Sequence, residues 1–231
     1  GMSCAWASSS TKSEKIAFSL IQRIARYDQK KKIFIIALGG GVIGDLAGFV
    51  AGVYKRGVAL VHVPTTFLSQ IDSSIGGKTA IDLSIAKNQV GVFHQPRLVL
   101  SDVVTLQTLS LRQVRNGLAE AIKYGVIKDK GLFDYIERHC DDILSCRLQP
   151  LTHVVESCSA IKAGIVEKDE RETRGLRTIL NFGHTIGHGV ETASVYGRYQ
   201  HGEAVALGMR MAASMSVQLG LCAAAQKDRL E

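Results

Sequence analysis

The sequence predicts an α/β N-terminal part joined to an all-helical C-terminal part, with the boundary near Leu109–Ser110. Two short, mainly apolar runs, 33–38 and 59–64, flank a glycine-rich turn and a helical segment, which is typical of a strand–helix–strand unit with parallel strands. After about Ser110 the strand signals stop and segments of helical period follow one another. We therefore expect a partial α/β domain over 11–109 and an incomplete helical domain over 110–231.

The elements of the N-terminal part follow from local patterns. A helix is predicted over Ser13–Tyr27, because apolar residues recur there at helical spacing. The stripe consists of Ile16, Leu20, Ile21 and Ile24. The runs Ile33–Leu38 and Ala59–Pro64 are expected to be parallel strands buried on both faces. A helix over 45–53 connects them, and Leu98–Leu100 predicts a further short strand.

The C-terminal part consists of segments whose apolar residues recur with a helical period. The predicted helices are 111–127, 130–144, 150–167, 177–193 and 202–219.

Composition excludes several classes of protein. The chain has 46% hydrophobic and 21% charged residues, and it contains no apolar run of the ~18–20 residues that span a membrane. Five cysteines form no CxxC pair, and their odd number argues against a disulfide framework, so we expect a reducing, cytoplasmic compartment. The net charge of +7 is spread along the chain and aromatic residues are only 6%, which disfavours nucleic acid and favours a small anionic ligand.

The segment Gly39–Asp45 contains G-x-G-x-x-G between a predicted strand and a predicted helix. This context is typical of a dinucleotide site, where backbone N–H groups face a pyrophosphate. The acidic residue that usually follows about 20 residues later to bind a ribose is absent, since nothing acidic lies between Asp45 and Asp72. A tight strand-to-helix turn without a nucleotide remains the alternative.

The segment Asp72–Thr79 resembles a phosphate-binding P-loop but has Asp72 where the first glycine is required. Kinase or NTPase chemistry is therefore a weak alternative. Lys78, Lys87 and Asn88 nevertheless supply cationic and amide donors suited to phosphate or carboxylate oxygens, unless they are simply solvated.

Three histidines near the C-terminus suggest a metal centre. His184 and His188 are four residues apart on one predicted helix face, and His201 follows. Neutral imidazole is a preferred zinc ligand, and a catalytic zinc has three protein ligands and an open position. Histidines that merely pack or cap a helix are the alternative for the pair alone; the third histidine favours a metal-assisted enzyme.

Polar residues also interrupt the apolar helices. Glu120 and Lys123 are three apart on a predicted helix, and are either an exposed ion pair or a carboxylate ligand beside a lysine. Lys162, Arg177 and Asn181 are further candidates, with surface exposure as the alternative for each.

Taken together, the motifs resemble those of the 3-dehydroquinate synthase family, in the same order over roughly Ile33 to Leu219. The matching segments are Gly39–Asp45, Val63–Thr66, Gln70–Thr79, Lys87–Asn88, Gly117–Tyr124, Asp169–Glu172, Leu180–Thr185 and His201–Val205. The resemblance implies a dehydroquinate synthase-like fold, in which a Rossmann-like NAD-binding domain precedes an all-α metal-binding domain.

The resemblance also implies a role for each matching residue. Glu120, His184 and His201 would bind zinc or cobalt, whereas His188 would lie beside the substrate. The other residues implied in substrate binding and catalysis are Asp72, Lys78, Lys87, Asn88, Lys123, Lys162, Arg177 and Asn181. Arg56 would reach into the site of a neighbouring subunit in a homodimer. The residues implied in NAD binding are Gly40, Gly41, Val42, Asp45, Thr65, Thr66, Thr108 and Leu109.

The activity implied is conversion of 3-deoxy-arabino-heptulosonate 7-phosphate to 3-dehydroquinate and phosphate, a phosphate-eliminating lyase step of the shikimate pathway of aromatic amino-acid biosynthesis. Family members begin earlier than this chain and continue beyond Glu231, so the resemblance implies a chain cut at both ends. Two alternatives remain: a sister sugar-phosphate cyclase or zinc polyol dehydrogenase, and an inactive truncated copy.

Overall fold

The computed structural model describes residues 12–29, 32–194 and 199–231. The chain divides into two compact units, Gly1–Gln107 and Thr108–Glu231, called unit 1 and unit 2 below, and each is described by itself. Within the described residues, no helix combines the length and apolar character needed to cross a membrane.

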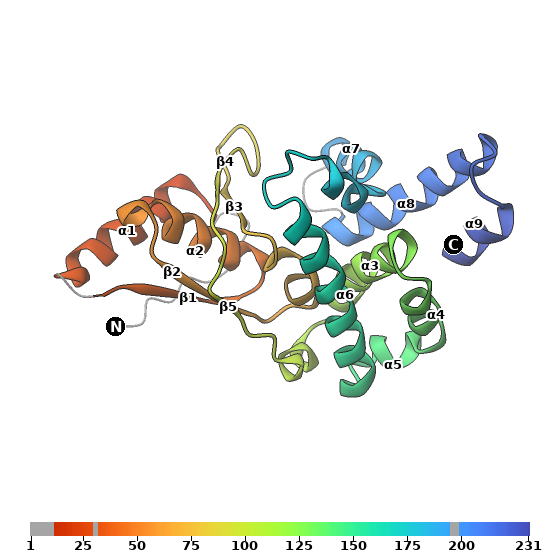
Figure 1. Cartoon of the computed structure of the whole chain (residues 1–231), viewed down its shortest axis with the longest axis horizontal. Helices are drawn as coiled ribbons and strands as arrows, with labels where there is room; N and C mark the ends of the chain where they lie inside the picture. The colour runs from red at the N-terminus through yellow and green to blue at the C-terminus, as the bar shows by residue number, and fades with distance from the viewer. Residues whose placement is uncertain (1–11, 30–31, 195–198) are drawn as a thin grey trace. The chain divides into compact units, whose positions relative to one another are not determined.

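Unit 1 is a small α/β assembly (Figure 1). Its elements are α1 (Glu14–Asp28), β1 (Phe34–Gly39), α2 (Gly41–Val53), η1 (Tyr54–Arg56), β2 (Ala59–Pro64), η2 (Ser69–Ser73), β3 (Lys78–Ile81), β4 (Val90–Phe93), β5 (Leu98–Val99) and η3 (Val103–Thr108), whose last residue is in unit 2. Strands β1, β2 and β5 form a parallel sheet in the order β1-β2-β5. Strands β3 and β4 form a separate antiparallel pair, which the sequence patterns did not predict.

Helix α1 has the stripe that its sequence predicts. Ser13 is the N-cap, and its hydroxyl accepts a hydrogen bond from the backbone N–H of Ile16 at 3.5 Å. The predicted stripe packs against a buried cluster that contains Leu46, Phe49 and Ile81. Burial of this stripe therefore fixes α1 against α2.

The sheet is covered on one face only among the described residues, so the expectation that β1 is buried on both faces is wrong here. Ala37 and Leu60 are buried with residues of α2 on the covered face. On the opposite face, Phe34, Ile36 and Leu38 are 62%, 57% and 60% exposed. An apolar run shows that both faces of a strand are apolar, but it does not show that both are covered.

Helix α2 begins at Gly41 rather than at Asp45, so the glycine-rich segment is itself the first turn of the helix. Gly40 is the N-cap, and its carbonyl accepts hydrogen bonds from the N–H groups of Ile43 and Gly44. The N–H groups at the start of α2 therefore have no partner one turn earlier in the helix.

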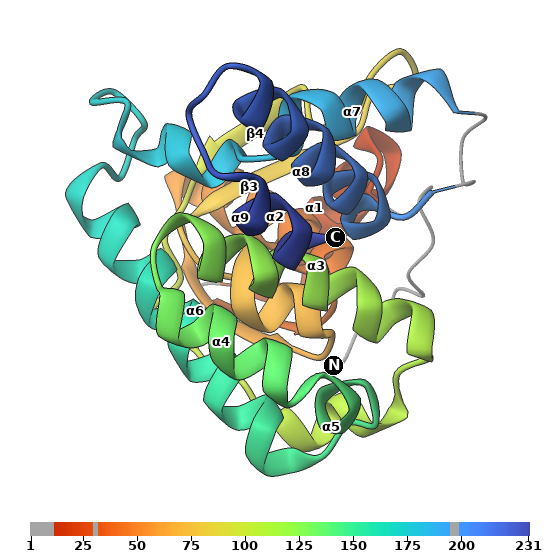
Figure 2. The ribbon, with the colours of Figure 1, turned by 90° about the vertical axis from the view of Figure 1, so that its right-hand side faces the viewer.

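Unit 2 is helical throughout its described part (Figure 2). Its elements are α3 (Leu111–Ile127), α4 (Lys130–Arg138), α5 (Cys140–Leu144), α6 (Leu148–Lys168), η4 (Leu176–Asn181), α7 (His184–Ala193), α8 (His201–Gln218) and α9 (Ala224–Leu230). The expected helix over 130–144 is interrupted at His139, and the one over 177–193 is interrupted before Gly183, which has φ of 79°. Helix α9 was not predicted.

Glycines allow α8 to approach both α3 and α7 closely. A Cβ on Gly202 would lie 2.1 Å from the backbone oxygen of Asn116, whose side-chain oxygen accepts a hydrogen bond from the Gly202 N–H at 2.6 Å. A Cβ on Gly208 would lie 1.9 Å from the backbone oxygen of Gly183. These two contacts fix where α8 starts and where it crosses α7.

Replacing Gly208 by alanine is expected to lower the free energy of unfolding by about 1–3 kcal/mol, because the new methyl group would overlap the backbone carbonyl of Gly183. Urea unfolding followed by circular dichroism measures the change. Gly164 on α6 is the control, since a Cβ there would have no other atom within 4 Å and alanine should stabilise by roughly 0.5–1 kcal/mol. Equal behaviour of the two variants would contradict the close crossing.

Candidate functional site

Three polar side chains from three helices of unit 2 converge at one point. Glu120 comes from α3, His184 from the first position of α7, and His201 from the first position of α8. One ligand atom from each lies within 4.8 Å of the other two. The Nε2 atoms of His184 and His201 are 3.5 and 3.6 Å from Oε1 of Glu120. This donor set, two imidazoles and one carboxylate, suits a catalytic divalent ion such as zinc.

Glu120 is the buried member of this group. It is 0% exposed, and both of its carboxylate oxygens are buried without a hydrogen bond from the protein. Lys123, 1% exposed, brings its ammonium group into contact with Oε2. The interpretation of Glu120 and Lys123 as an exposed ion pair is therefore wrong. Lys123 pairs with Oε2, whereas Oε1 is buried without a hydrogen bond and faces both histidines, so a bound cation fits at Oε1.

The surroundings of His184 favour its neutral form. Burial lowers the pKa of His184; Glu120 acts to raise it, while Lys123 and His201 lower it further. Its Nδ1 faces the carbonyl oxygen of Phe182 at 3.3 Å, so an Nδ1–H donates there and leaves the Nε2 lone pair directed at the centre. The neutral tautomer that a metal requires is thus the one that the backbone favours.

His188 lies at the edge of this cluster and is exposed. Its ring centroid is 5.6 Å from that of His184 and 6.0 Å from that of His201. Among the described residues it belongs to a different candidate group, with Glu191 and His201. In the part of the chain that the structure describes, His184 and His188 share no group of three ligands, so the geometry does not favour the simple pair that the spacing suggested.

Besides Lys123, two candidate cations of unit 2 are buried, which rules out the alternative of surface exposure for them. Lys162 on α6 is 6% exposed and Arg177 on η4 is 3% exposed. An Nη1–H of Arg177 donates to the backbone oxygen of Glu170 at 2.8 Å, and its Nε is 3.5 Å from Oε1 of Glu172. Asn181, at the end of the same 3₁₀ segment, is exposed.

The loop before η4 is shaped by Asp169. Its two carboxylate oxygens accept hydrogen bonds from the backbone N–H groups of Arg174 and Leu176. Burial acts to raise the pKa of Asp169, but these backbone donors together hold it below its usual value. The ionised carboxylate therefore organises the turn that carries Arg177.

In unit 1 the glycine-rich turn lies against the segment that follows β2. A Cβ on Gly40 would lie 2.9 Å from Cγ2 of Thr66, and one on Gly41 would lie 2.9 Å from Oγ of Ser73. The N–H of Thr65 donates to the carbonyl of Gly39 at 3.0 Å. The structure thus brings the candidate residues Gly40, Gly41 and Thr66 together, with Val42 in the same helical turn.

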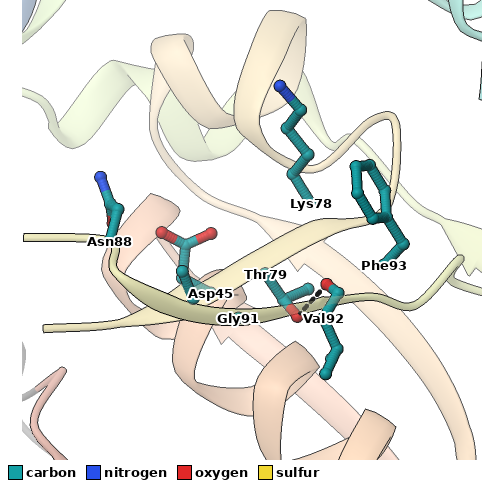
Figure 3. Close-up of a pocket in the computed structure, with 8 residues that line it drawn as sticks. Asp45, Lys78, Thr79, Asn88, Gly91, Val92 and Phe93 are labelled. Carbon is teal, nitrogen blue, oxygen red and sulfur yellow. Dashed lines mark hydrogen bonds between the residues drawn. The ribbon is translucent and has the colours of Figure 1, made fainter. Parts of the chain in front are cut away.

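Asp45, Lys78 and Asn88 line a cavity of about 450 Å³ beside the β3–β4 pair (Figure 3). Asp45 and Asn88 lie together, and Lys78 lies nearer Phe93. The buried Lys12 donates a hydrogen bond to Asp45 at 2.7 Å and contacts the side-chain oxygen of Asn88. Candidate cofactor and substrate residues therefore share one polar cluster.

The other candidates occupy separate positions. Asp72 lies in the π-helical η2, and Lys78 begins a strand, whereas a P-loop lysine begins a helix. The P-loop alternative is therefore wrong. Lys87 is exposed, and Arg56 is exposed with φ of 66°. Thr108 ends η3 and Leu109 follows it.

One acidic residue near the candidate centre escaped the sequence reasoning. Glu191 lies on α7, and its Oε1 is 3.6 Å from Nδ1 of His201. The signal was present, since Glu191 follows His188 by three residues and so shares its helix face.

Two family profiles match the chain, "3-dehydroquinate synthase N-terminal" over residues 4–116 and "3-dehydroquinate synthase C-terminal" over 117–231. The chain is 52% identical over 196 residues to the 3-dehydroquinate synthase of Desulforamulus reducens and 54% identical over 196 residues to that of Nitrosococcus oceani. Each match covers 85% of this chain and 54% of the relative, so the chain spans about half the length of these curated relatives.

Solved structures of sugar-phosphate cyclases resemble the chain. A 2-deoxy-scyllo-inosose synthase complexed with carbaglucose-6-phosphate, NAD⁺ and Co²⁺ has a TM-score of 0.88 and 32% identity, over 97% of this chain and 60% of that one. The 2-epi-5-epi-valiolone synthase of Streptomyces hygroscopicus, with NAD⁺ and Zn²⁺ bound, has a TM-score of 0.90 and 31% identity, over 98% and 63%. A glycerol dehydrogenase of Schizosaccharomyces pombe shares the fold at a TM-score of 0.67 and 18% identity, over 95% and 58%. With both of its halves matched by the corresponding profiles, the chain belongs to the 3-dehydroquinate synthase family.

Proposed function

We propose that the chain carries 3-dehydroquinate synthase activity, the conversion of 3-deoxy-arabino-heptulosonate 7-phosphate to 3-dehydroquinate and phosphate in the shikimate pathway. One observation carries this proposal: a buried carboxylate and two histidines form a candidate metal site in a unit that also buries Lys123, Lys162 and Arg177. The substrate has a carboxylate and a phosphate, and buried cations are suited to such groups.

The side chains of unit 2 have distinct tasks in this proposal. Lys123 contacts Glu120 and therefore lies next to the metal position, where its ammonium group can hold a substrate hydroxyl. Nη1 of Arg177 donates a hydrogen bond to the backbone oxygen of Glu170, and Lys162 is buried on α6. We assign these two cations, with Asn181 and His188, to the anionic groups of the substrate. The cavity residues Lys78 and Asn88 of unit 1, with Asp72 and Lys87, are assigned to the same ligand.

The proposed cofactors are NAD and zinc, with cobalt as a substitute. NAD supplies reversible hydride transfer, and the metal supplies polarisation of the substrate oxygen at the carbon that is oxidised. Glu120, His184 and His201 would hold the metal. The turn Gly40–Val42 presents backbone N–H groups to a pyrophosphate, and Asp45, Thr65, Thr66, Thr108 and Leu109 complete the set that we assign to NAD. The cyclases with known structures bind NAD⁺ together with Co²⁺ or Zn²⁺, which supports this assignment.

A sister sugar-phosphate cyclase is the second candidate, since the solved relatives with TM-scores of 0.88 and 0.90 have that activity. A zinc polyol dehydrogenase is the third, supported at the level of fold. The identities of 52% and 54% to relatives named 3-dehydroquinate synthase favour the first.

Incubated with catalytic amounts of NAD, zinc and 3-deoxy-arabino-heptulosonate 7-phosphate, the chain should release phosphate and 3-dehydroquinate without accumulating NADH, because the hydride is returned. Mass spectrometry and absorbance at the NADH band measure these outcomes. Lasting NADH would indicate a dehydrogenase, turnover of only another sugar phosphate would indicate a sister cyclase, and no turnover of any of them would indicate an inactive copy.

Two lysines on α6 provide a matched control for this assay. Lys162→Met removes a buried charge and should lower kcat/KM about 10- to 100-fold, the usual effect of losing a charged hydrogen bond. Lys168 lies at the exposed end of the same helix, so Lys168→Met should leave kcat/KM close to that of the parent chain.

The chain should bind one divalent ion, and Glu120→Gln or His201→Ala should abolish tight zinc binding, because each removes one of three ligands. His188→Ala should keep most of the metal. Inductively coupled plasma mass spectrometry after dialysis gives the stoichiometry. If His188→Ala loses metal as fully as His201→Ala while Glu120→Gln keeps it, the ion belongs to the group of His188, Glu191 and His201 instead.

We also propose a homodimer in which Arg56 serves the site of the other subunit. Arg56 is exposed, lies in η1 directly after α2, and has a left-handed backbone conformation beside Gly57. The rigid fork of an arginine grips phosphate or carboxylate through two parallel hydrogen bonds, which suits a residue that completes a site from outside.

Mixing Arg56→Ala chains with Lys123→Ala chains should restore part of the activity, because each mixed dimer then contains one intact site. The control pairs Lys123→Ala with Arg26→Ala, an exposed arginine of α1 whose variant should be active on its own. Mixed dimers of proven composition that recover nothing would place Arg56 in its own subunit's site or outside the site.

A further inference from the structure

We propose that Glu191 is a positioning residue for the metal centre, in which it orients His201 and fixes its tautomer. This inference rests on the metal assignment of the proposed function. Nothing in the sequence motifs assigns Glu191 a role.

The two ring nitrogens of His201 face two different carboxylates. Nε2 is 3.6 Å from Oε1 of Glu120, on the side of the metal position. Nδ1 is 3.6 Å from Oε1 of Glu191, on the opposite side of the ring. The ring therefore lies between a buried carboxylate that shares its metal and a half-buried carboxylate that faces its other nitrogen.

With a cation at the centre offsetting the Glu120 carboxylate, the Glu191 carboxylate decides which nitrogen of His201 carries the proton. A neutral imidazole has one N–H, and a metal ligand needs the other nitrogen unprotonated. A carboxylate facing Nδ1 stabilises the Nδ1–H tautomer and leaves the Nε2 lone pair for the metal. The 3.6 Å separation is longer than an N–H···O hydrogen bond, so the contact in this structure is electrostatic.

The two histidines differ in the group that faces Nδ1. The Nδ1 of His184 already faces the backbone oxygen of Phe182 at 3.3 Å, and its side chain is more buried than that of His201. His201 stands at the first position of α8. Glu191, from the facing helix α7, supplies an acceptor for Nδ1.

Glu203, the other acidic residue near His201, has a different role. Glu203 accepts hydrogen bonds from Nε and Nη2 of Arg112 and from the backbone N–H of Gln200, where it forms the capping box of α8. The helix start is thus fixed by Glu203 and Gly202, while Glu191 faces the Nδ1 atom of the ring at that start.

A competing role for Glu191 is that of a direct ligand, since Glu191, His188 and His201 also lie within 4.8 Å of one another. That group is more exposed than the one with Glu120, and it contains no fully buried carboxylate. The two roles differ in what His188 does: an orienting Glu191 acts without His188, whereas a liganding Glu191 needs it.

The test measures the zinc dissociation constant of the full chain by competition with a chromophoric chelator. Glu191→Gln keeps the size of the side chain but removes its charge, and should weaken zinc binding about 10-fold, within the 10- to 100-fold range typical of such outer partners. Glu191→Asp should be intermediate. Glu167→Gln, at an exposed glutamate of α6, is the control and should bind zinc like the parent chain.

A second readout follows the imidazole itself. In the metal-free chain, where Glu120 faces Nε2 and Glu191 faces Nδ1 at the same 3.6 Å, ¹⁵N shifts of His201 should report both tautomers, and Glu191→Gln should shift the population toward Nε2–H. In the cobalt-substituted protein the visible absorption bands should keep their position in Glu191→Gln, because the ligands are unchanged.

Each outcome decides the proposal. Unchanged zinc affinity together with an unchanged His201 tautomer would overturn it. Loss of zinc in both Glu191→Gln and His188→Ala, with altered cobalt bands, would make Glu191 a ligand rather than a positioning residue. If the parent chain binds no zinc, the metal assignment fails, and the tautomer measurement on the metal-free chain still decides whether Glu191 orients His201.

Discussion

The carboxylate of Glu120 imposes the strongest constraint on unit 2. It is completely buried, receives no hydrogen bond from the protein, and faces the ammonium group of Lys123 and the Nε2 atoms of two histidines. Removing an ionised carboxylate from water costs several kcal/mol unless cations or donors surround it. The three helices that meet there therefore have to present positive or coordinating groups. A divalent ion satisfies this requirement better than Lys123 alone, because it attracts both oxygens and both imidazoles.

The helix crossings bring these groups within reach of one another. His184 and His201 stand at the first positions of two helices, and both helix starts are held by contacts that only glycine permits. Gly202 lies against the backbone of Asn116, one turn before Glu120 on α3, and Gly208 lies against Gly183, next to His184. The tight packing of these backbones therefore also sets the geometry of the candidate metal site. A bulkier residue in these crossings would move an imidazole as well as a helix.

In unit 1, the close contacts are made by the glycine-rich turn. The glycine-rich turn is the first turn of α2 rather than a loop before it, so the N–H groups at the helix start and the contact with Thr66 come from one short segment. Lys12 then joins Asp45 of this helix to Asn88 of the β3–β4 connection. The exposed apolar side chains of β1 show that this unit leaves one face of its sheet uncovered among the described residues.

The sequence by itself determined the class of the fold, most element positions and the family. Helices α1, α3, α6 and α8 and strands β1, β2 and β5 lie within a few residues of where periodicity places them, because apolar spacing is a local property. Residue order was enough to indicate the candidate ligands, since long motifs are specific even when single residues are not.

Only the tertiary structure decided which residues are buried and which of them contact one another. Spacing places Glu120 and Lys123 on one helix face, but only packing makes that face an interior one. Likewise, spacing pairs His184 with His188, whereas the crossing of α7 and α8 brings His184 beside His201. The same crossing places Glu191 next to the Nδ1 atom of His201. Such contacts join residues that are far apart in the chain, and no local pattern records them.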